Sequence, residues 1–428
     1  MSLELYTYQI DALKRMKTGS ILCGGVGSGK SRTALSYFFI RVCKGKVRLY
    51  SIDKETGERC LVINKFEEAK KPRDLYIITT AKKRDSLEWE SECVPFIFEQ
   101  SGIHVIVDSW NNISKYTDIR NSYFIFDEQR VVGYGAWTKA FLKITKYNPW
   151  ILLSATPGDT WIDYIPVFVA NGFYRNKTEF LRTHVVFSRF CKFPKVEKFL
   201  LTGRLLKYRN SILVDMDYRK NTKQHHEYVY SEYDKLAVER VRQTRWNPFT
   251  NEPIENISEY CYILRKIVNS SEGRKAIVKD LIANNERTIV FYNFMYELDI
   301  LHEIAKELGI TYAEWNGHKH QEIPDNDSWT YFVQYNSGSE GWNCIKTNVI
   351  IFYSQSYSYR AMVQASGRID RVNTKYKDLY YYHISSMSRI DKEISMALKR
   401  KKKFNETNSS FGKEFYDVGK DKPMLQVR

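Results

Sequence analysis

The most specific chemical signal in the sequence is a glycine-rich run at residues 24–31, which reads G-x-x-x-x-G-K-S. An apolar stretch at 20–23 precedes the run and a helical pattern at 33–42 follows it, which is the context that a phosphate-binding loop needs. The glycines let backbone N–H groups converge on a phosphate at a helix N-terminus. Lys30 is expected to neutralise β- and γ-phosphate oxygens, and the Ser31 hydroxyl is expected to bind Mg²⁺. We assign the following residues of the run to nucleotide binding: Gly24, Gly25, Gly27, Ser28, Gly29, Lys30 and Ser31.

A pair of carboxylates, Asp127 and Glu128, closes an apolar strand candidate at 123–126. We expect Asp127 to hold Mg²⁺ through its water shell and Glu128 to take a proton from the attacking water. Together with the glycine-rich run, this pair predicts an enzyme that hydrolyses ATP and uses ATP and Mg²⁺ as cofactors.

Composition narrows the choice of partner. The 428 residues include 66 basic and 50 acidic side chains, for a net charge of +16, which is consistent with nucleic acid or an anionic membrane surface. The apolar runs fall short of the ~20 residues that cross a bilayer, and the N-terminus carries no secretion signal. The seven cysteines are dispersed, which fits a reducing compartment. We therefore expect a cytoplasmic protein without membrane contact.

The order of the strand and helix patterns predicts an α/β fold. Short apolar strands alternate with amphipathic helices in the first half, a pattern typical of a parallel sheet. Strands are expected at 20–23, 75–79, 103–107, 123–126 and 150–153, with a hairpin inside 44–73. The segment from 190 to 271 is more basic, and a helix is expected at 223–245. The alternation then returns, with strands at 287–292, 331–334, 349–353 and 379–383 and a helix at 297–308.

From this order we expect two parallel-sheet lobes in tandem, joined by a basic, partly helical connecting segment. The expected parts are an ATP-binding lobe at 1–188, a basic linker at 189–272, a second lobe at 273–398 and a basic polar tail at 399–428.

Two further stretches bear on what ATP hydrolysis drives. Residues 153–157 place two hydroxyls directly after an apolar strand, where release of a phosphate can be sensed. Residues 364–371 read Q-x-x-G-R-x-x-R, so Arg368 and Arg371 are expected three apart on one helical face. In that position both arginines can act as fingers on a γ-phosphate.

In this combination and order, the motifs resemble those of superfamily 2 helicases and translocases, and more narrowly of the Swi/Snf-like branch. The resemblance spans roughly residues 5–401 and implies two RecA-like lobes. It also implies that Gln9 reads adenine and that Gly341 and Gln364 belong to the nucleotide site. The stretches that carry it are 5–9, 24–31, 78–81, 107–110, 127–130, 154–156, 289–293, 337–343 and 364–371. The narrower branch is indicated by 194–195, Gln224, Tyr228, 264–269 and 389–393.

The same resemblance suggests which residues hold the nucleic acid. Hydroxyl and amide groups at motif positions are expected to contact phosphates, namely Thr80, Ser109, Asn293 and Ser337. Three aromatic residues can stack on bases, namely Trp110, Trp342 and Tyr357. Core packing is the open alternative for each of these rings.

The function that these observations favour is an ATP-dependent DNA helicase or translocase that moves along DNA or remodels it. Arg130 stands where DEAD or DEAH proteins carry Asp or His, which argues against DEAD-box RNA unwinding. Alternatives are an RNA helicase of the same superfamily, a nucleotide-gated nucleic-acid-binding protein, or the motor subunit of a larger complex.

The expected partner is DNA in single-stranded, duplex or forked form, with RNA less favoured. The chain is similar to small motors of phage or bacterial replication, recombination and defence loci. That similarity suggests replication or recombination proteins as further partners, in a bacterial or phage-infected cytoplasm.

Overall fold

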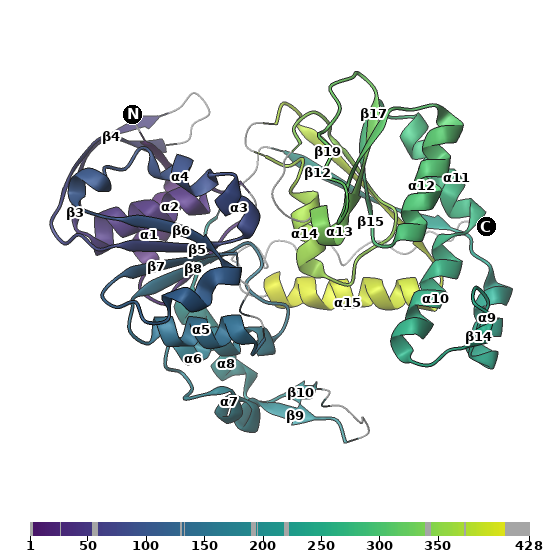
Figure 1. The fold of residues 1–428 in the computed structure, drawn as a ribbon, viewed down its shortest axis with the longest axis horizontal. Helices are drawn as coiled ribbons and strands as arrows, with labels where there is room; N and C mark the ends of the chain where they lie inside the picture. Colours follow the sequence, from purple (N-terminus) through teal and green to yellow (C-terminus); the bar gives the residue numbers. More distant parts are fainter. Residues whose placement is uncertain are drawn as a thin grey trace. The chain divides into compact units, whose positions relative to one another are not determined.

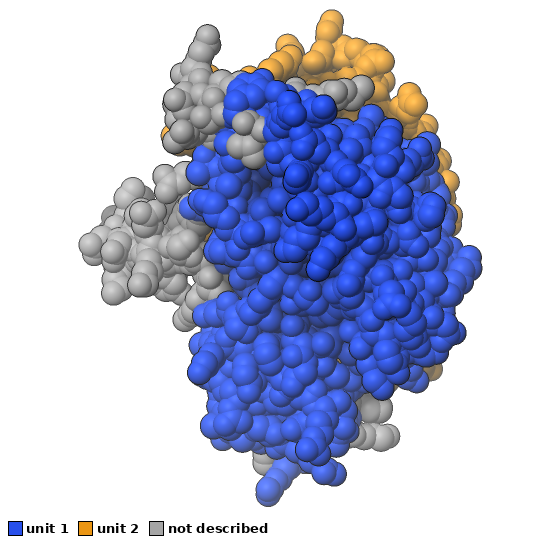
Figure 2. Space-filling model, turned by 90° about the vertical axis from the view of Figure 1, so that its left-hand side faces the viewer, with its two compact units in different colours: residues 1–218, 404–428 blue, residues 219–403 orange. Residues whose placement is uncertain are grey.

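The chain forms two compact units, residues 1–218 with 404–428 and residues 219–403 (Figure 2). The computed structural model describes residues 3–25, 27–53, 59–128, 131, 133–189, 194, 196–217, 222–338, 344–371 and 374–406. Each unit is built on a six-stranded parallel sheet, so the expected pair of RecA-like α/β lobes is confirmed (Figure 1). Among the described helices, none is long and apolar enough to span a membrane.

The sheet of the first unit has the strand order β11-β2-β8-β7-β5-β6. Its strands are β2 (Ile21–Cys23), β5 (Leu75–Thr79), β6 (Val105–Ser109), β7 (Tyr123–Asp127), β8 (Trp150–Ser154) and β11 (Leu213–Asp215). Every residue of β5, β7 and β8 is buried, because both faces of a parallel sheet are covered. Ile125 and Ile151 pack in one apolar core, whereas Phe124 and Leu152 point to the opposite face and pack in a second core.

Helices and turns of the first unit supply the cover for those two faces. The α-helices are α1 (Thr7–Arg15), α2 (Lys30–Tyr37), α3 (Ala81–Asp85), α4 (Glu88–Cys93), α5 (Ala136–Thr145), α6 (Ile165–Ala170), α7 (Lys177–His184) and α8 (Thr202–Ile212). A π-helical turn, η1 (Phe38–Val42), continues α2, and 3₁₀ turns lie at η2 (Glu99–Ser101), η3 (Trp110–Tyr116) and η4 (Trp161–Tyr164).

The hairpin that the sequence predicts inside 44–73 is present. Strands β3 (Gly45–Asp53) and β4 (Arg59–Ala69) pair antiparallel, and β1 (Leu3–Tyr6) adds a third strand on the other side of β4. The expected turn at 54–57 lies outside the described residues. A second small pair, β9 (Val185–Phe187) with β10 (Val196–Phe199), was not predicted.

The sheet of the second unit has the strand order β12-β19-β18-β15-β17-β16. Its strands are β12 (Lys223–Ser231), β15 (Arg287–Tyr292), β16 (Tyr312–Trp315), β17 (Trp329–Gln334), β18 (Val349–Phe352) and β19 (Asp378–Ser386). Figure 1 shows α11 (Glu272–Ala283) and α12 (Met295–Leu308) on one side of β15, with α13 (Tyr335–Gly338) and α14 (Tyr359–Ser366) on the other. The remaining elements are α9 (Lys235–Thr244), β13 (Trp246–Asn247), β14 (Glu252–Pro253), α10 (Ile257–Asn269) and α15 (Arg389–Glu406).

The structure divides the chain differently from the four expected parts. Segment 189–272 is not a separate linker, because β10, α8 and β11 belong to the first unit and β12 forms an edge of the second sheet. The expected tail at 399 begins inside α15, which continues to Glu406.

The predicted helix at 223–245 is wrong for its first nine residues, which form strand β12. This strand pairs in parallel with β19 along its whole length. Cross-strand ring stacking stabilises the pair, since His225 lies 5.0 Å from Tyr380 and Tyr228 lies 4.7 Å from His383 between ring centres. Only α9 is helical in this region.

A buried ion pair attaches α15 to the rest of the second unit. The guanidinium of Arg274 donates to the Tyr353 carbonyl at 2.9 Å and to Asp391 Oδ2 at 2.8 Å. Ser386 Oγ donates to the same carboxylate oxygen at 2.8 Å. Because Arg274 is fully buried, loss of either partner leaves an uncompensated charge in the interior.

We therefore expect Asp391→Asn to lower the free energy of unfolding of the second unit by about 3–5 kcal/mol. The matched control is Glu393→Gln, two residues away on the same helix, where the exposed pair with Arg389 contributes at most about 1 kcal/mol. Urea denaturation of the full chain, followed by circular dichroism, measures both. Equal losses of stability in the two variants would contradict the assignment.

Candidate active site

The glycine-rich run forms a loop between β2 and α2, as the sequence predicts. Gly27 and Gly29 have φ of 82° and 73°, in the left-handed region that glycine adopts without strain. Lys30 opens α2 and its Nζ donates to the carbonyls of Gly24 at 2.8 Å and Gly25 at 2.9 Å. The lysine thus folds back over the loop, and Ser31 follows it in the first turn of the helix.

Gln9 braces this loop from α1. Its Nε2 donates to the Ser28 carbonyl at 3.3 Å and its Oε1 accepts from the Tyr6 backbone N–H at 2.9 Å. A Cβ atom at Gly29 would lie only 2.3 Å from Gln9 Nε2, so a larger residue there would displace the Gln9 amide and would also be strained by the positive φ. The structure therefore places Gln9 against the phosphate-binding loop, and its contact with adenine stays a prediction.

The acidic pair lies where β7 ends, and three donors converge on one carboxylate oxygen. Asp127 is 1% exposed, and its Oδ2 accepts from Thr79 Oγ1 at 2.8 Å, Lys83 Nζ at 2.9 Å and Trp89 Nε1 at 3.1 Å. Among the described residues, none donates to Oδ1. Lys83 Nζ also lies 3.8 Å from Glu128 Oε1.

Charge and burial act against each other at this cluster. Burial alone would raise the pKa of Asp127, but the charge of Lys83 and the three hydrogen bonds hold it below its ordinary value. The same contact raises the pKa of Lys83 although burial opposes it. Burial lowers the pKa of Lys30, and the charges of Glu128 and Asp127 partly offset that effect. The loop lysine and the acidic pair therefore share one electrostatic environment.

Lys83, Thr79 and Trp89 are site residues that the sequence did not identify. Thr79 ends β5, the neighbour of β7, and Lys83 lies in the short helix that follows β5. Their proximity to Asp127 depends on β5 and β7 being adjacent in the sheet. The sequence contains both strands but does not give the order in which they pair.

Thr80 and Ser109, which the sequence predicts as contacts with nucleic-acid phosphates, have local structural roles in the first unit. Thr80 Oγ1 caps α3 by accepting from the Lys83 backbone N–H at 3.3 Å. Ser109 is buried and its backbone N–H donates to Asp108 Oδ1 at 2.7 Å. Asp108 also accepts from Tyr116 Oη at 2.7 Å. Burial opposes ionisation of Asp108, but these hydrogen bonds outweigh it and lower its pKa to about 2.

The expectation that Trp110 stacks on bases is wrong. The residue is 2% exposed, and its indole N–H donates to the Asp127 carbonyl at 2.9 Å. Its ring packs against Phe126 at 5.5 Å and Trp137 at 6.3 Å between ring centres. Core packing, the alternative reading, describes this residue.

In the second unit, the expectation of two arginines on one helical face is also wrong. Helix α14 ends at Ser366, so Arg368 and Arg371 lie in the segment beyond it. That segment is held by Asp370, whose carboxylate accepts from Thr222 Oγ1 at 2.7 Å and from Gln224 Nε2. The bonds to the β12 region draw the chain away from a helical path.

The other predicted residues of the second unit are distributed as follows. Gln364 is buried on α14. Asn293 follows β15 and its Nδ2 donates to Ser354 Oγ at 2.8 Å. The Ser337 carbonyl, on α13, accepts from Trp315 Nε1 at 3.0 Å. Gly341 and Trp342 of the second unit lie outside the described residues, as do Gln129 and Arg130 of the first unit.

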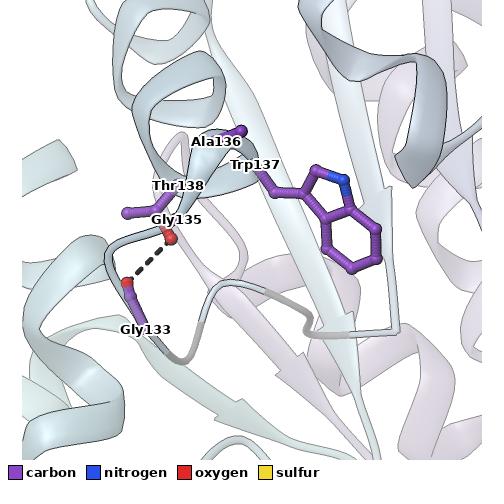
Figure 3. A pocket seen from close by; sticks show the side chains of 5 residues that line it. All are labelled: Gly133, Gly135, Ala136, Trp137 and Thr138. Carbon is purple, nitrogen blue, oxygen red and sulfur yellow. Dashed lines mark hydrogen bonds between the residues drawn. The ribbon is translucent and has the colours of Figure 1, made fainter.

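A hollow of about 270 Å³ lies at the start of α5, beyond the acidic pair in sequence. Gly133, Gly135, Ala136, Trp137 and Thr138 line it, and Thr138 Oγ1 donates to the Gly133 carbonyl at 2.8 Å (Figure 3). None of these five described residues is titratable, so they offer no acid, base or metal ligand for catalysis.

The cluster at the end of β7 generates a prediction about stability and pH. Lys83→Met removes the largest effect that opposes burial at Asp127, so we expect the pKa of this carboxyl to rise above its unfolded value instead of falling below it. The parent keeps the stabilisation from ionised Asp127 above about pH 4 and loses it only at lower pH. In the variant, the free energy of unfolding instead falls as pH rises above about pH 4, because Asp127 must then ionise without its partner. At neutral pH the variant is expected to be less stable than the parent by on the order of 3 kcal/mol.

Thermal unfolding of parent and variant between about pH 4 and about pH 7 tests this sign. The gap between their midpoints is expected to widen as pH rises. Lys143→Met is the control, because Lys143 forms an exposed pair with Asp118 on the same unit. A gap for Lys83→Met that stays constant with pH would refute the electrostatic role.

Comparison with known proteins adds a family match in the second unit. Residues 273–373 match the family model described as the helicase conserved C-terminal domain. Among solved structures, the chain is similar to the Sulfolobus solfataricus SWI2/SNF2 ATPase core in complex with dsDNA. The identity is 14% and the TM-score 0.41, over 97% of this chain and 95% of that chain. No curated protein matches the chain. This match lies within the second unit, as expected from the resemblance to superfamily 2 helicases.

Proposed function

We propose that the chain is an ATP-dependent DNA helicase or translocase. The observation that carries the proposal is the convergence of Lys30, Asp127 and Glu128 at the carboxyl edge of one parallel sheet, where α/β folds bind ligands. The second unit of the same chain matches the helicase C-terminal domain, which supports a motor over a kinase or a switch.

The residues of the loop fit a magnesium nucleotide. A Cβ atom at Gly24 would lie 2.5 Å from Ser28 Oγ, so the turn is too tight for a side chain and leaves backbone N–H groups as phosphate donors. Lys30 and the Ser31 hydroxyl would hold the phosphates and the metal from this side, and Asp127 from the other. The bound ion supplies charge neutralisation on the β- and γ-phosphates.

Within the acidic pair we assign different tasks to the two carboxylates. Asp127 has three donors on Oδ2, which orients Oδ1 for a ligand of the metal. Glu128 has φ of 58°, an unusual value for a residue other than glycine and one that concentrates at functional turns. We assign Glu128 as the general base that orients and deprotonates the attacking water.

The remaining nucleotide residues are proposed by resemblance. Gln9 would read adenine and Gly341 would line the nucleotide. Gln364, Arg368 and Arg371 would act from the second unit, with both arginines neutralising charge on the γ-phosphate. Nucleotide binding then favours one arrangement of the units and hydrolysis releases it.

DNA is the proposed track, with phosphate contacts from Thr80, Asn293 and Ser337 and base stacking by Trp342. Ser109 is as buried as Trp110 and is not retained as a contact. The motif order similar to the Swi/Snf-like branch supports DNA over RNA. An RNA helicase remains the second candidate, since contacts with phosphates do not report the sugar. A nucleotide-gated clamp or the motor subunit of a larger complex would share the same ATP site. Replication or recombination proteins are the proposed partners, in a bacterial or phage-infected cytoplasm.

Steady-state ATP hydrolysis tests the function directly. The parent is expected to hydrolyse ATP faster with single-stranded, duplex or forked DNA than without it, and to respond weakly to single-stranded RNA. Lys30→Ala provides the blank, since it removes the ammonium that holds the phosphates. Stimulation by RNA alone would replace DNA with RNA as the track, and a rate unaffected by any nucleic acid would reject the motor.

The assignment of Arg371 is tested by Arg371→Ala. We expect nucleotide binding to be retained and stimulated turnover to fall by about 10³-fold or more, as for loss of an arginine finger. A fluorescent ATP analogue measures binding, and Glu128→Gln serves as the reference for a variant that binds without turnover. Turnover of Arg371→Ala at the parental stimulated rate would show that the motif is wrongly assigned.

A further inference from the structure

The second unit presents a band of aromatic rings, of which only Tyr357 was a base-stacking candidate from the sequence. We call it the ring track and define it by Phe249, Tyr262, Phe294, Tyr296 and Tyr357. It extends from the small β13–β14 hairpin, along α10, to the segments that follow β15 and β18.

Ring contacts join the middle of the track. Phe294 and Tyr296 stack with their centres 5.4 Å apart. Tyr262 lies edge-on to both rings, at 5.2 Å from Phe294 and 5.8 Å from Tyr296. Three rings from two different elements therefore form one cluster.

Two cations on α10 extend that cluster in both directions. Lys266 Nζ lies 4.1 Å from the centre of the Phe249 ring and 5.9 Å from that of Tyr296. The Arg265 guanidinium lies 4.8 Å from the Phe294 ring centre and 5.8 Å from that of Tyr357. Such cation–ring contacts hold both partners in place.

The outer rings are accessible. Phe249 is 47% exposed, and Tyr262 and Tyr357 are each 40% exposed. Large exposed apolar side chains that lie next to one another mark a contact surface, whereas isolated ones need no explanation.

The track is rigid where it meets the sheet. Arg265 Nη2 donates to the Gln355 carbonyl at 2.9 Å and to Ser354 Oγ at 3.3 Å. Ser354 also bonds the Asn293 amide and the buried Glu297 carboxylate. This end of the track therefore lies at the carboxyl ends of parallel strands β15 and β18, the edge at which such sheets bind ligands.

Charge along the track favours an anionic occupant. Lys266 flanks one end, and Lys401 Nζ donates to the Tyr357 carbonyl at 3.0 Å at the other. Two of the nearby carboxylates are engaged within the unit, and Glu393 pairs with Arg389, whereas Glu252 and Glu255 are exposed beside the hairpin. Glu259 accepts from the Asn247 side chain and from the backbone of α10 and its preceding turn, and Glu297 is buried in its network.

Partly exposed rings that are interleaved with cations match an occupant that offers flat apolar faces at regular intervals along an anionic backbone. A single nucleic-acid strand has this chemistry, because its bases stack on aromatic side chains and its phosphates pair with cations. A duplex keeps its base faces inside the helix and offers the track only phosphates.

We propose that the ring track binds a single nucleic-acid strand, with bases stacking on Phe249, Tyr262 and Tyr357 and phosphates beside Lys266 and Lys401. The inference rests on the proposed function and adds a contact surface outside the motif residues. It assigns to α10 and the β13–β14 hairpin the task of holding the strand beyond the carboxyl edge of the second sheet.

Fluorescence anisotropy with a labelled oligothymidylate and the full chain tests the proposal. Phe249→Ala, Tyr262→Ala and Tyr357→Ala are each expected to weaken binding by about 5- to 150-fold, whereas Tyr357→Phe keeps its ring and its affinity. Tyr230→Ala is the matched control, since Tyr230 is 58% exposed on β12 of the same unit. Parental affinity in all three ring variants would overturn the proposal.

The dependence of binding on salt separates stacking from charge. The ring variants are expected to keep the parental slope of log affinity against log salt, whereas Lys266→Gln reduces its magnitude by about 0.7, the value for one phosphate contact on a single strand. An unchanged slope in Lys266→Gln would show that Lys266 does not contact a phosphate, and it would overturn the charge assignment.

Photocrosslinking of the parent chain to an oligonucleotide that carries iodouracil identifies the contact residues without any substitution, so misfolding of a variant cannot affect the result. Crosslinks are expected at Phe249, Tyr262 or Tyr357, and crosslinks confined to other segments would overturn the track. Binding of duplex alone would overturn the track while leaving the motor intact. Absence of both binding and stimulated ATP hydrolysis would instead reject the proposed function, and the track with it.

Discussion

The buried carboxylate of Asp127 is the constraint on which the first unit depends. A carboxylate at the end of a fully buried strand is costly to ionise, yet only the ionised form binds a metal. Lys83, Thr79 and Trp89 resolve this conflict by concentrating their donors on Oδ2. The pairing of β5 with β7 is what brings Lys83 to Asp127, so the metal role that we propose for Asp127 depends on this strand order.

In the second unit, hydrogen bonds also surround a buried carboxylate, and here they join neighbouring elements of the fold. Glu297 accepts from Asn269, Ser354 and the Asn293 backbone. These bonds tie α10 to the ends of β15 and β18, the same edge from which the ring track begins. Polar bonds are stronger in a low-dielectric interior than in water, so these contacts help to fix α10 and the strand ends from which the ring track begins.

The central strands were predictable because burial on both faces of a parallel sheet leaves a continuous apolar run. β5 and β15 have the expected bounds, and β7 and β8 differ from theirs by one residue. Edge strands lack that signature, and β12 carries the polar run from Lys223 to His226. Its strand conformation depends on pairing with β19. The two strands are far apart in the sequence, as the hydrogen bond between His225 and Asp378 shows with a separation of 153 residues, so no local pattern predicts this strand.

The same distinction applies to the site. Motif residues follow strands directly and can be identified by their spacing, whereas Lys83 and Arg265 act through neighbours brought near by the fold. Trp110 shows the converse, because a motif position indicated a surface role and the fold uses the ring as core. Residue type and spacing report which chemistry is available, but exposure decides whether a ring can stack on a ligand.

In the glycine-rich loop, the hydrogen bonds that Lys30 already makes bear on how the loop would bind the nucleotide that we propose. Lys30 is held by two neutral carbonyls, and burial lowers its pKa, so its charge is only partly compensated. Phosphate oxygens are charged acceptors, and charge-assisted hydrogen bonds are roughly twice as strong as neutral ones. A nucleotide therefore gains by exchanging acceptors at a lysine that is already in place. The loop needs no new fold to bind phosphate, because its backbone is already set by the left-handed glycines and by Gln9.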